Sequence, residues 1–517
     1  MSPDRGDADA FDGATRAQWL AGDLRARLLR TLALPRWSMR LVDADGTRTI
    51  DAAALGRGAA GFVAAARAPG LGPGAVVARA TADGAAALQA WVGATLAGLV
   101  PTFVPPAQPE LARTGGATVA LWVGASTPSP SLPRWDEAPG LPTTASSPGA
   151  PALLQRTGGT TDAPRMIAPT HAQVLAQLWG LGRALALTRD DRIASFLPLH
   201  HDMGLVSTVL LPLLCGIDCV RLSPSLWRTR PESFLRTIAD AGATLTWVPP
   251  AALGRLAVRV DPDGLALASL RQIVCGGEPV VADLFDAFAR RFAGCGLRSN
   301  VLGAGWGAAE NVAAITQSPL ATGARRLVLA RDALALHRPV RRAADGEPAI
   351  VLVSCGPAIE GTTVTVVDDL GRALPERSPG LLRVAGDCVG AGHFDSGDVG
   401  LIDGGEVFVL GRRDELLAQG HRVVLPQELE AAAAAVPGVI PGRCEAVAED
   451  DGRIVLLLGS ELPPADQAAL VAAVGDAVEA RAGVRPDQLR VLPRGWLRKS
   501  SAGKHARGRS RARLRTP

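Results

Sequence analysis

Apolar and polar positions follow two periods along this chain, one typical of helices and one typical of strands. Apolar residues recur at helical spacing in AQWLAGDLRARLLRTLAL, which predicts a helix over residues 17–34. Residues 39–105 then have the pattern of a hairpin around Asp45-Gly46, a helix, a strand, and a second helix that leads into a strand. Strands and helices that follow one another in this order are typical of an α/β fold.

The middle of the chain repeats this order, and its short apolar strands end in small or polar residues. Three such strand ends have distinctive sequences, which are LPLHHDMGL (197–205), CGGEPV (275–280) and GAGWGAAE (303–310). An α/β fold places its functional site at the C-terminal ends of its strands. We therefore expect these three turns to gather around one site.

Beyond residue 411 the pattern changes to that of a small α+β module. It predicts a helix over LPQELEAAAAAVPG, a hairpin around Asp451-Gly452 and a helix over PADQAALVAAVGDAVEARAG. A chain of 517 residues is also too long for one hydrophobic core. We expect two domains, residues 1–411 and residues 412–517, with a hinge near Asp414.

The composition is that of a globular protein, with 47% hydrophobic and 20% charged residues. Long apolar stretches such as residues 206–220 are shorter than a bilayer span, and the acidic N-terminus has no apolar signal core. We therefore expect no membrane span and a cytoplasmic location. The seven cysteines include no CxxC pair, which favours free thiols over a disulfide or zinc framework.

The net charge is only +4, and much of the basic excess lies in the last twenty residues. A nucleic-acid-binding protein would usually have a broader basic face with aromatic residues for stacking, and this chain has no tyrosine, so we discount nucleic acid as a partner. Only two of the 54 basic residues are lysines, Lys499 and Lys504, and both lie in RKSSAGK. A lysine at this place needs an explanation, whereas the arginines after it are typical of a solvated tail.

Residues 153–171, LLQRTGGTTDAPRMIAPTH, have the layout of a phosphate-binding loop. Closely spaced glycines and hydroxyls follow an apolar strand end, at Thr157, Gly158, Gly159, Thr160 and Thr161. Glycines let backbone N–H groups reach phosphate oxygens, hydroxyls can bind the same oxygens, and Arg165 adds a cation. Thr170 is a candidate N-cap for the next helix. The Walker A pattern is absent, and a polar linker would have the same composition.

Two histidines and an aspartate stand together after one of the strands, at His200, His201 and Asp202. These residue types can form a metal site, but adjacent side chains on an extended strand point in opposite directions and cannot easily share one ion. Two other interpretations remain, a structural role and a place in the wall of a substrate pocket.

Together these segments resemble the motifs of adenylate-forming enzymes, the superfamily of acyl-CoA synthetases, peptide-synthetase adenylation domains and luciferases. The loop from Thr157 is similar to their TSGSTGxPKG, with Gly158, Asp162 and Met166 departing from it and Arg165 in place of the lysine. LPLHHDMGL is most similar to the LPLYHDMGL of fatty acyl-AMP ligases, CGGEPV to their NGAEPV, and residues 317–350 to their insertion. The resemblance covers nearly the whole chain from Met39 onward.

The resemblance also implies a role for each matching residue. The loop Thr157, Gly158, Gly159, Thr160, Thr161 and Arg165 and the turn Gly276, Gly277 and Glu278 would bind ATP. Trp306 with Gly307 would face adenine, Asp398 of Ser396-Gly397-Asp398 would accept the ribose hydroxyls, and Arg412 belongs to the motif that joins the domains. His201 would gate the acyl pocket, Glu310 and Thr161 would bind Mg²⁺, and Lys504 would be the catalytic lysine.

The fold implied is α/β, with a large adenylate-forming domain of layered sheets plus a distorted β-barrel and a small α+β C-terminal lid. The activity implied is ATP- and Mg²⁺-dependent conversion of an apolar carboxylic acid to acyl-AMP, followed by transfer to a phosphopantetheine thiol of a carrier protein. Alternatives are an acyl-CoA synthetase, a relative that uses another nucleophile, and a non-catalytic nucleotide-binding protein. We expect a monomer or a weak dimer.

Overall fold

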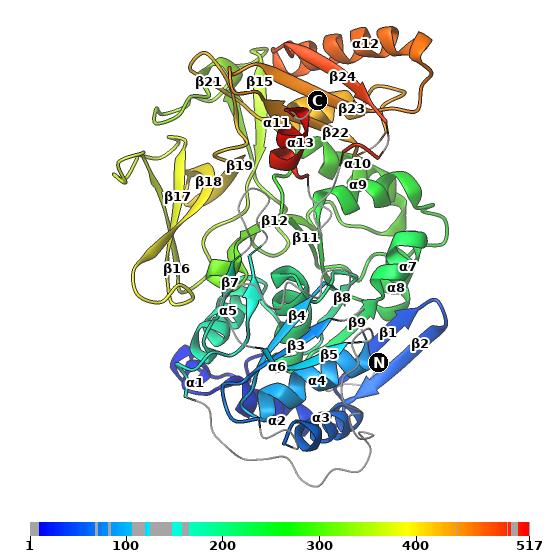
Figure 1. Cartoon of the computed structure of the whole chain (residues 1–517), viewed down its shortest axis with the longest axis vertical. Coiled ribbons are helices and arrows are strands. Elements are labelled where there is room, and N and C mark those ends of the chain that lie inside the picture. Colours follow the sequence, from blue (N-terminus) through cyan, green and yellow to red (C-terminus); the bar gives the residue numbers. More distant parts are fainter. Residues whose placement is uncertain are drawn as a thin grey trace.

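The computed structural model describes residues 10–67, 71–80, 84–105, 119–124, 147–157, 165–440, 442–493, 495–497 and 505–515. Figure 1 shows the N-terminal helices at one end of the long axis and the C-terminal module at the other. Among the described residues, no helix is long and apolar enough to cross a membrane.

The largest sheet has the strand order β13-β12-β11-β10-β8-β9-β1-β2. Its central strands run parallel, and β2 and β13 pair antiparallel at the two edges. The strands are β1 (Ser38–Asp43), β2 (Gly46–Asp51), β8 (Arg192–Ser195), β9 (Asp218–Leu222), β10 (Leu245–Val248), β11 (Gln272–Gly276), β12 (Leu302–Gly307) and β13 (Ala314–Gln317).

A second, smaller sheet has the order β4-β3-β5 and is parallel throughout. It comprises β3 (Val76–Ala80), β4 (Val100–Val104) and β5 (Val119–Gly124). The helices of this part of the chain are α1 (Arg16–Leu20), α2 (Leu24–Leu32), α3 (Ala52–Arg67), α4 (Ala85–Leu96), α5 (His171–Ala184), α6 (Leu211–Cys215), α7 (Pro224–Thr229), α8 (Glu232–Ala241), α9 (Pro250–Arg259) and α10 (Ala282–Phe292).

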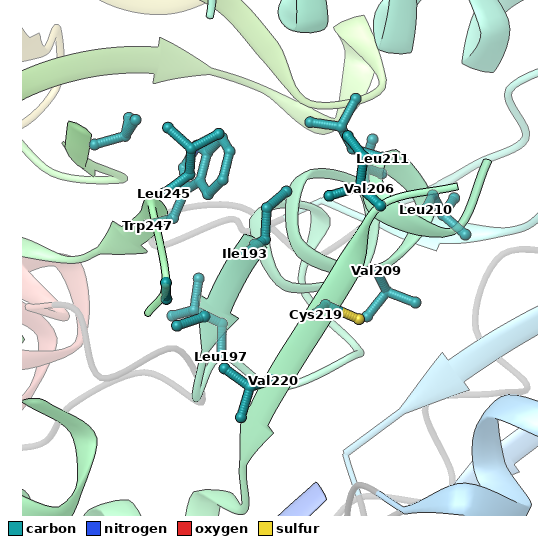
Figure 2. Packing of buried hydrophobic residues seen from close by; sticks show 14 of the residues in the cluster. Ile193, Leu197, Val206, Val209, Leu210, Leu211, Cys219, Val220, Leu245 and Trp247 are labelled. Atoms are coloured by element: carbon teal, nitrogen blue, oxygen red, sulfur yellow. The ribbon is translucent and has the colours of Figure 1, made fainter. Parts of the chain in front are cut away.

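The core of the large sheet is apolar on both faces, as parallel strands covered by helices require. All residues of β10 and β11 are buried. Figure 2 shows Ile193, Val220 and Trp247, from three neighbouring strands, in one apolar cluster with Val206 and Leu210 of the π-helix η2 (Met203–Leu210). This packing fixes the strand ends from which the candidate site residues project.

The helix expected over residues 17–34 is two helices, because α1 ends at Leu20 and Asp23 begins α2. Its carboxylate accepts a hydrogen bond from the Ala26 amide at 2.8 Å and caps α2. An aspartate at this position stabilises a helix start more than it stabilises a helix interior. The hairpin expected at Asp45-Gly46 is confirmed, with Asp43 paired to Gly46.

Antiparallel strands follow the large sheet, on the side coloured yellow in Figure 1. They form a hairpin of β14 (Arg326–Ala330) and β15 (Ala349–Val353), and a four-stranded sheet of β16 (Thr362–Val367), β17 (Gly380–Gly386), β18 (His393–Asp403) and β19 (Glu406–Arg412). These separate sheets take the place expected for the distorted barrel. The turn at Gly404-Gly405 joins β18 to β19.

The C-terminal module has its own apolar core, built from residues 417–484. It contains β20 (Leu417–Gln419), β21 (Arg422–Val424), α11 (Pro426–Ala434), β22 (Cys444–Ala448), β23 (Ile454–Gly459), α12 (Pro464–Ala482), β24 (Gln488–Leu492) and α13 (Arg507–Leu514). Both expected helices and the hairpin around Asp451-Gly452 are confirmed. The boundary at residues 411 and 412 and the hinge at Asp414 stay predictions.

Candidate functional site

A cavity of about 820 Å³ lies between the large sheet, the strands β18 and β19 and the C-terminal module. Its walls include ten of the residues selected from the sequence, namely Thr157, Arg165, His201, Gly277, Glu278, Trp306, Gly307, Glu310, Asp398 and Arg412. Gly276 is buried at the end of β11 behind this wall, where a side chain would meet the Gly305 carbonyl oxygen at 2.6 Å. Segments far apart in the sequence therefore meet at one cavity.

The segment predicted to bind phosphate contains a short antiparallel pair of strands, β6 (Gln155–Arg156) and β7 (Met166–Ile167). The Thr157 amide donates to the Arg165 carbonyl at 2.9 Å, and the Arg165 amide donates to the Thr157 hydroxyl at 3.0 Å. These two bonds close the base of the loop. Gly158, Gly159, Thr160 and Thr161 lie outside the described residues, so their role stays a prediction.

Arg165 and Glu310 form an ion pair on the cavity wall, with Nη2 3.1 Å from Oε1. The Arg165 side chain is 74% exposed and that of Glu310 is 24% exposed. A pair this accessible to water contributes little to stability. The pair can therefore open at small cost, and a phosphate-binding role for Arg165 stays a prediction.

The turn after Glu310 has an unusual backbone conformation. Val312 is buried with φ 68° and ψ −52°, which is rare and strained for a β-branched residue. Its carbonyl oxygen accepts a hydrogen bond from Gln155 Nε2 at 2.8 Å, and Gln155 is itself buried. This bond ties the base of the phosphate-binding segment to the turn that holds Glu310.

Sequence reasoning missed Gln155. The available signal was a glutamine at the end of an apolar run, two positions before the Thr/Gly-rich loop, because an amide buried at such a place needs a hydrogen-bond partner. The partner, a main-chain carbonyl 157 residues away, could not be read from the sequence.

Asp398, which also lines the cavity, is held by two side chains. Trp306 Nε1 donates to Asp398 Oδ2 at 2.9 Å, and Arg412 Nη1 lies 3.5 Å from Oδ1. Arg412 also donates to the Ser396 carbonyl at 2.6 Å, and Gly397, at φ 75°, leaves room for the guanidinium that a side chain would meet. The carboxylate is thus oriented before any ligand binds.

Trp306 is only 7% exposed and packs in a cluster with Ile315, Cys355 and Leu382. Its N–H is engaged by Asp398, so the indole positions that carboxylate as well as lining the cavity. That the ring stacks against adenine stays a prediction.

Glu278 lies in the turn after β11, where Gly277 has φ 88°, a conformation that favours glycine. The half-buried carboxylate accepts a hydrogen bond from the His505 amide at 3.1 Å. Lys504 and Lys499 lie outside the described residues, and the catalytic role given to Lys504 stays a prediction.

The segment LPLHHDMGL corrects one expectation, because it is not extended at the histidines. The strand β8 ends at Ser195, the His201 amide donates to the Pro198 carbonyl at 3.3 Å, and η2 follows. The rings of His200 and His201 are therefore near each other, with centroids 4.8 Å apart, rather than on opposite faces. Gly204 permits this fold, since a side chain there would meet the Pro198 carbonyl oxygen at 2.1 Å.

Only His201 of the two histidines lines the cavity, together with Asp202. Burial, with the nearby His201 and Arg156, lowers the pKa of His200 to about 3, so its ring is neutral at physiological pH. Within the described ranges no group of three or more His, Cys, Asp or Glu side chains could hold a metal ion. The seven cysteines are all buried.

The comparisons with known proteins agree with this arrangement. The family model described as AMP-binding enzyme matches residues 116–394, which is more than half of the chain. The chain therefore belongs to the AMP-binding enzyme family. A medium-chain-fatty-acid–[acyl-carrier-protein] ligase, JamA of Moorena producens, is 28% identical over 309 residues, which are 54% of this chain and 52% of JamA.

Solved structures share the fold across almost the whole chain. A fatty acyl-adenylate ligase structure from a study of the Escherichia coli and Legionella pneumophila proteins has a TM-score of 0.85 and 22% identity, covering 95% of this chain and 97% of its own. A Legionella pneumophila fatty acyl-adenylate ligase in complex with acyl adenylate and pyrophosphate has a TM-score of 0.73 and 22% identity, with 98% of each chain covered. At this identity the likeness establishes the fold.

Proposed function

We propose that this protein is a ligase that uses ATP to convert an apolar carboxylic acid to acyl-AMP and then transfers the acyl group to a phosphopantetheine thiol of a carrier protein. The observation that carries the proposal is that two groups of side chains line one cavity. One group is Arg165 with Glu310, and the other is Asp398 with Trp306 and Arg412. A nucleotide needs both, a cation for its phosphates and an oriented carboxylate for its ribose hydroxyls.

In the first half-reaction a carboxylate oxygen of the acid attacks the α-phosphorus of ATP. The new bond is acyl oxygen to phosphorus, and the bond that breaks releases pyrophosphate with its electron pair. Arg165 binds phosphate oxygens, Asp398 fixes the ribose, and Lys504 offsets the charge between the attacking oxygen and the α-phosphate. A compact ammonium suits that place because it does not impose the planar geometry of a guanidinium.

Mg²⁺ fits the residues present, because Glu310 offers a partly exposed carboxylate on the cavity wall and Mg²⁺ prefers oxygen ligands. Glu310 and Thr161 would hold the ion, which would neutralise charge on the leaving pyrophosphate.

In the second half-reaction a thiol sulfur attacks the acyl carbonyl carbon, AMP leaves, and the thiol proton passes to solvent. The names of relatives support a carrier protein as the acceptor, since JamA is an acyl-carrier-protein ligase. We also propose that His201 closes the acyl end of the cavity, and that residues 412–517 move as a lid about Asp414 between the two half-reactions.

Release of pyrophosphate across a panel of acids tests the proposal, followed by mass spectrometry of the acceptor. Fatty or aryl acids should release pyrophosphate, and a holo carrier protein should gain the acyl group. Efficient acyl-CoA formation with no acylated carrier would identify an acyl-CoA synthetase instead. Activity on amino acids alone would refute an apolar substrate.

A further inference from the structure

His505, near the C-terminal end of the chain, has hydrogen-bond partners in both parts of the protein, the part that contains the large sheet and the C-terminal module. The His505 amide N–H donates to Glu278 Oε1 at 3.1 Å, and the His505 ring Nδ1 lies 3.1 Å from Glu445 Oε1. Glu278 belongs to the turn after β11 of the large sheet, and Glu445 belongs to β22 of the C-terminal module. His505 therefore lies where the two parts meet, on the cavity wall.

The contact between His505 and Glu445 is buried, is supported by further hydrogen bonds and is costly to break. The Glu445 side chain is 1% exposed, and it also accepts hydrogen bonds from the Ser510 hydroxyl and, at 3.4 Å, from the Ala506 amide. Burial alone would raise the pKa of Glu445, but the hydrogen bond and charge of His505 and the Ser510 hydroxyl hold it below its ordinary value. An ionised carboxylate buried with these partners would be costly to separate from them.

A second carboxylate, that of Glu430, holds the start of helix α13 through Arg507. Arg507 donates to Glu430 at 2.7 and 2.8 Å and to Glu415 at 2.9 Å. The start of α13 is thus fixed to α11 and β22 of its own module and to the segment that follows β19. The start of this helix cannot shift without breaking charge-assisted hydrogen bonds.

The contact to Glu278 is different in kind. It is a single hydrogen bond from a main-chain amide to a half-buried carboxylate on the other part of the protein, so it can form and break as the two parts move. The donor N–H belongs to the peptide bond between Lys504 and His505, which places the acceptor one peptide unit from Lys504.

We infer that Glu278 is a positioning residue for Lys504, which accepts the His505 amide when the two parts meet and so presents the lysine to the cavity for acyl-AMP formation. The inference rests on the proposed function. It assigns to the Glu278 carboxylate a role in the first half-reaction and none in the second, because the second half-reaction does not need the ammonium.

The test compares Glu278→Ala, which removes the acceptor, with Glu278→Gln, which keeps an acceptor oxygen. Glu278→Ala should lower kcat for acyl-AMP formation about 10- to 100-fold, which corresponds to loss of one hydrogen bond to a charged acceptor. The inference replaces the ATP contact that the sequence resemblance implies for Glu278 by the contact with the His505 amide. The KM for ATP should therefore stay within about twofold, as should the rate of transfer from a supplied acyl-adenylate. Glu278→Gln should recover most of the lost rate.

Asp283→Ala is the matched control, because Asp283 forms an ion pair with Arg481 of α12 and so also joins the two parts without touching residue 505. Its kcat should change by no more than about twofold, as for an exposed ion pair. Equal losses in Asp283→Ala and Glu278→Ala, or equal losses in both half-reactions, would overturn the inference.

Hydrogen exchange at the His505 amide supplies a readout that does not depend on activity. Exchange should be faster in Glu278→Ala than in the wild type and should return to the wild-type rate in Glu278→Gln. Unchanged exchange in Glu278→Ala would overturn the inference. A wild-type protein without adenylation activity would refute the proposed function, while the exchange rates would still show whether Glu278 holds residue 505.

Discussion

The guanidinium of Arg165 lies 3.1 Å from the carboxylate of Glu310, so the cation expected to bind phosphate and the carboxylate expected to bind Mg²⁺ are paired with each other. Glu310 occupies the place beside Arg165 that a phosphate would need, and Arg165 occupies the place beside Glu310 that Mg²⁺ would need. Binding of ATP with Mg²⁺ has to replace this pair by two others, Arg165 with phosphate and Glu310 with the ion.

The first prediction follows from this exchange of partners. Arg165→Ala should raise the KM for ATP about tenfold or more, because one charge-assisted hydrogen bond is lost, and should lower the Mg²⁺ concentration for half-maximal rate, because Glu310 no longer has a competing cation. Titrations of ATP and Mg²⁺ measure both effects. Arg236→Ala, at an exposed position on α8, is the control. An Arg165→Ala enzyme with unchanged constants would show that Arg165 does not contact phosphate.

The second prediction concerns the bond from Gln155 to the Val312 carbonyl. Gln155→Leu leaves that buried carbonyl without its side-chain donor, so unfolding free energy should fall by about 1–3 kcal/mol. Because the strained turn also holds Glu310, the Mg²⁺ concentration for half-maximal rate should rise. Urea unfolding and an Mg²⁺ titration check the two parts.

Gln89→Leu is the control for this variant, since Gln89 Nε2 donates to the Ala54 carbonyl at 3.2 Å away from the cavity. It should lose stability without any change in the Mg²⁺ dependence. The same Mg²⁺ dependence in both variants would contradict a positioning role for Gln155.

The third prediction separates the two roles of Trp306. Trp306→Phe keeps an apolar ring in the cluster but removes the N–H that orients Asp398, so the KM for ATP should rise about 3- to 10-fold, as for loss of one hydrogen bond. Trp37→Phe should cost similar stability, because Trp37 Nε1 donates to the buried Ile217 carbonyl, and should leave the KM unchanged. Identical KM values in the two variants would mean that Asp398 does not need the indole.

The fourth prediction is a dependence of stability on pH. The folded pKa of His200 is about 3 against an ordinary value of 6.5, so between these values the unfolded chain binds a proton that the folded chain does not. The contribution of His200 to the free energy of unfolding is therefore fully present above pH 6.5. The free energy of unfolding should fall by at most about 1.4 kcal/mol per pH unit as the pH drops below that value.

Urea unfolding at several pH values between about 7.5 and 5 checks this, because that interval spans the unfolded pKa of histidine. His200→Gln should flatten the acid side of the profile, whereas His393→Gln, at an exposed position, should not. A slope unchanged in His200→Gln would show that His200 is not the group responsible.

Much of the fold was accessible from the sequence because the local signals agree with the tertiary structure. The N-cap at Thr170 is confirmed, with a capping box to Gln173, since capping depends on residues only three positions apart. The small-residue turns that follow the strands lie at one cavity, because parallel strands have their C-terminal ends at the same edge of the sheet.

The parts that the sequence did not reveal depend on contacts between distant segments. The pairs Arg165–Glu310, Gln155–Val312 and Glu278–His505 join residues 145, 157 and 227 positions apart. The turn at His201 was taken for extended strand because no glycine or proline lies between His200 and Met203, and its glycine, Gly204, acts by making room for Pro198.

The most direct test of the central claim is to incubate the enzyme with an apolar carboxylic acid and ATP labelled at the α-phosphate, without an acceptor. The label should appear in an acyl-AMP, in an amount that depends on the acid, and pyrophosphate should be the other product. Release of labelled ADP, which would mean attack at the γ-phosphate, or the absence of any acid-dependent product would contradict the central claim.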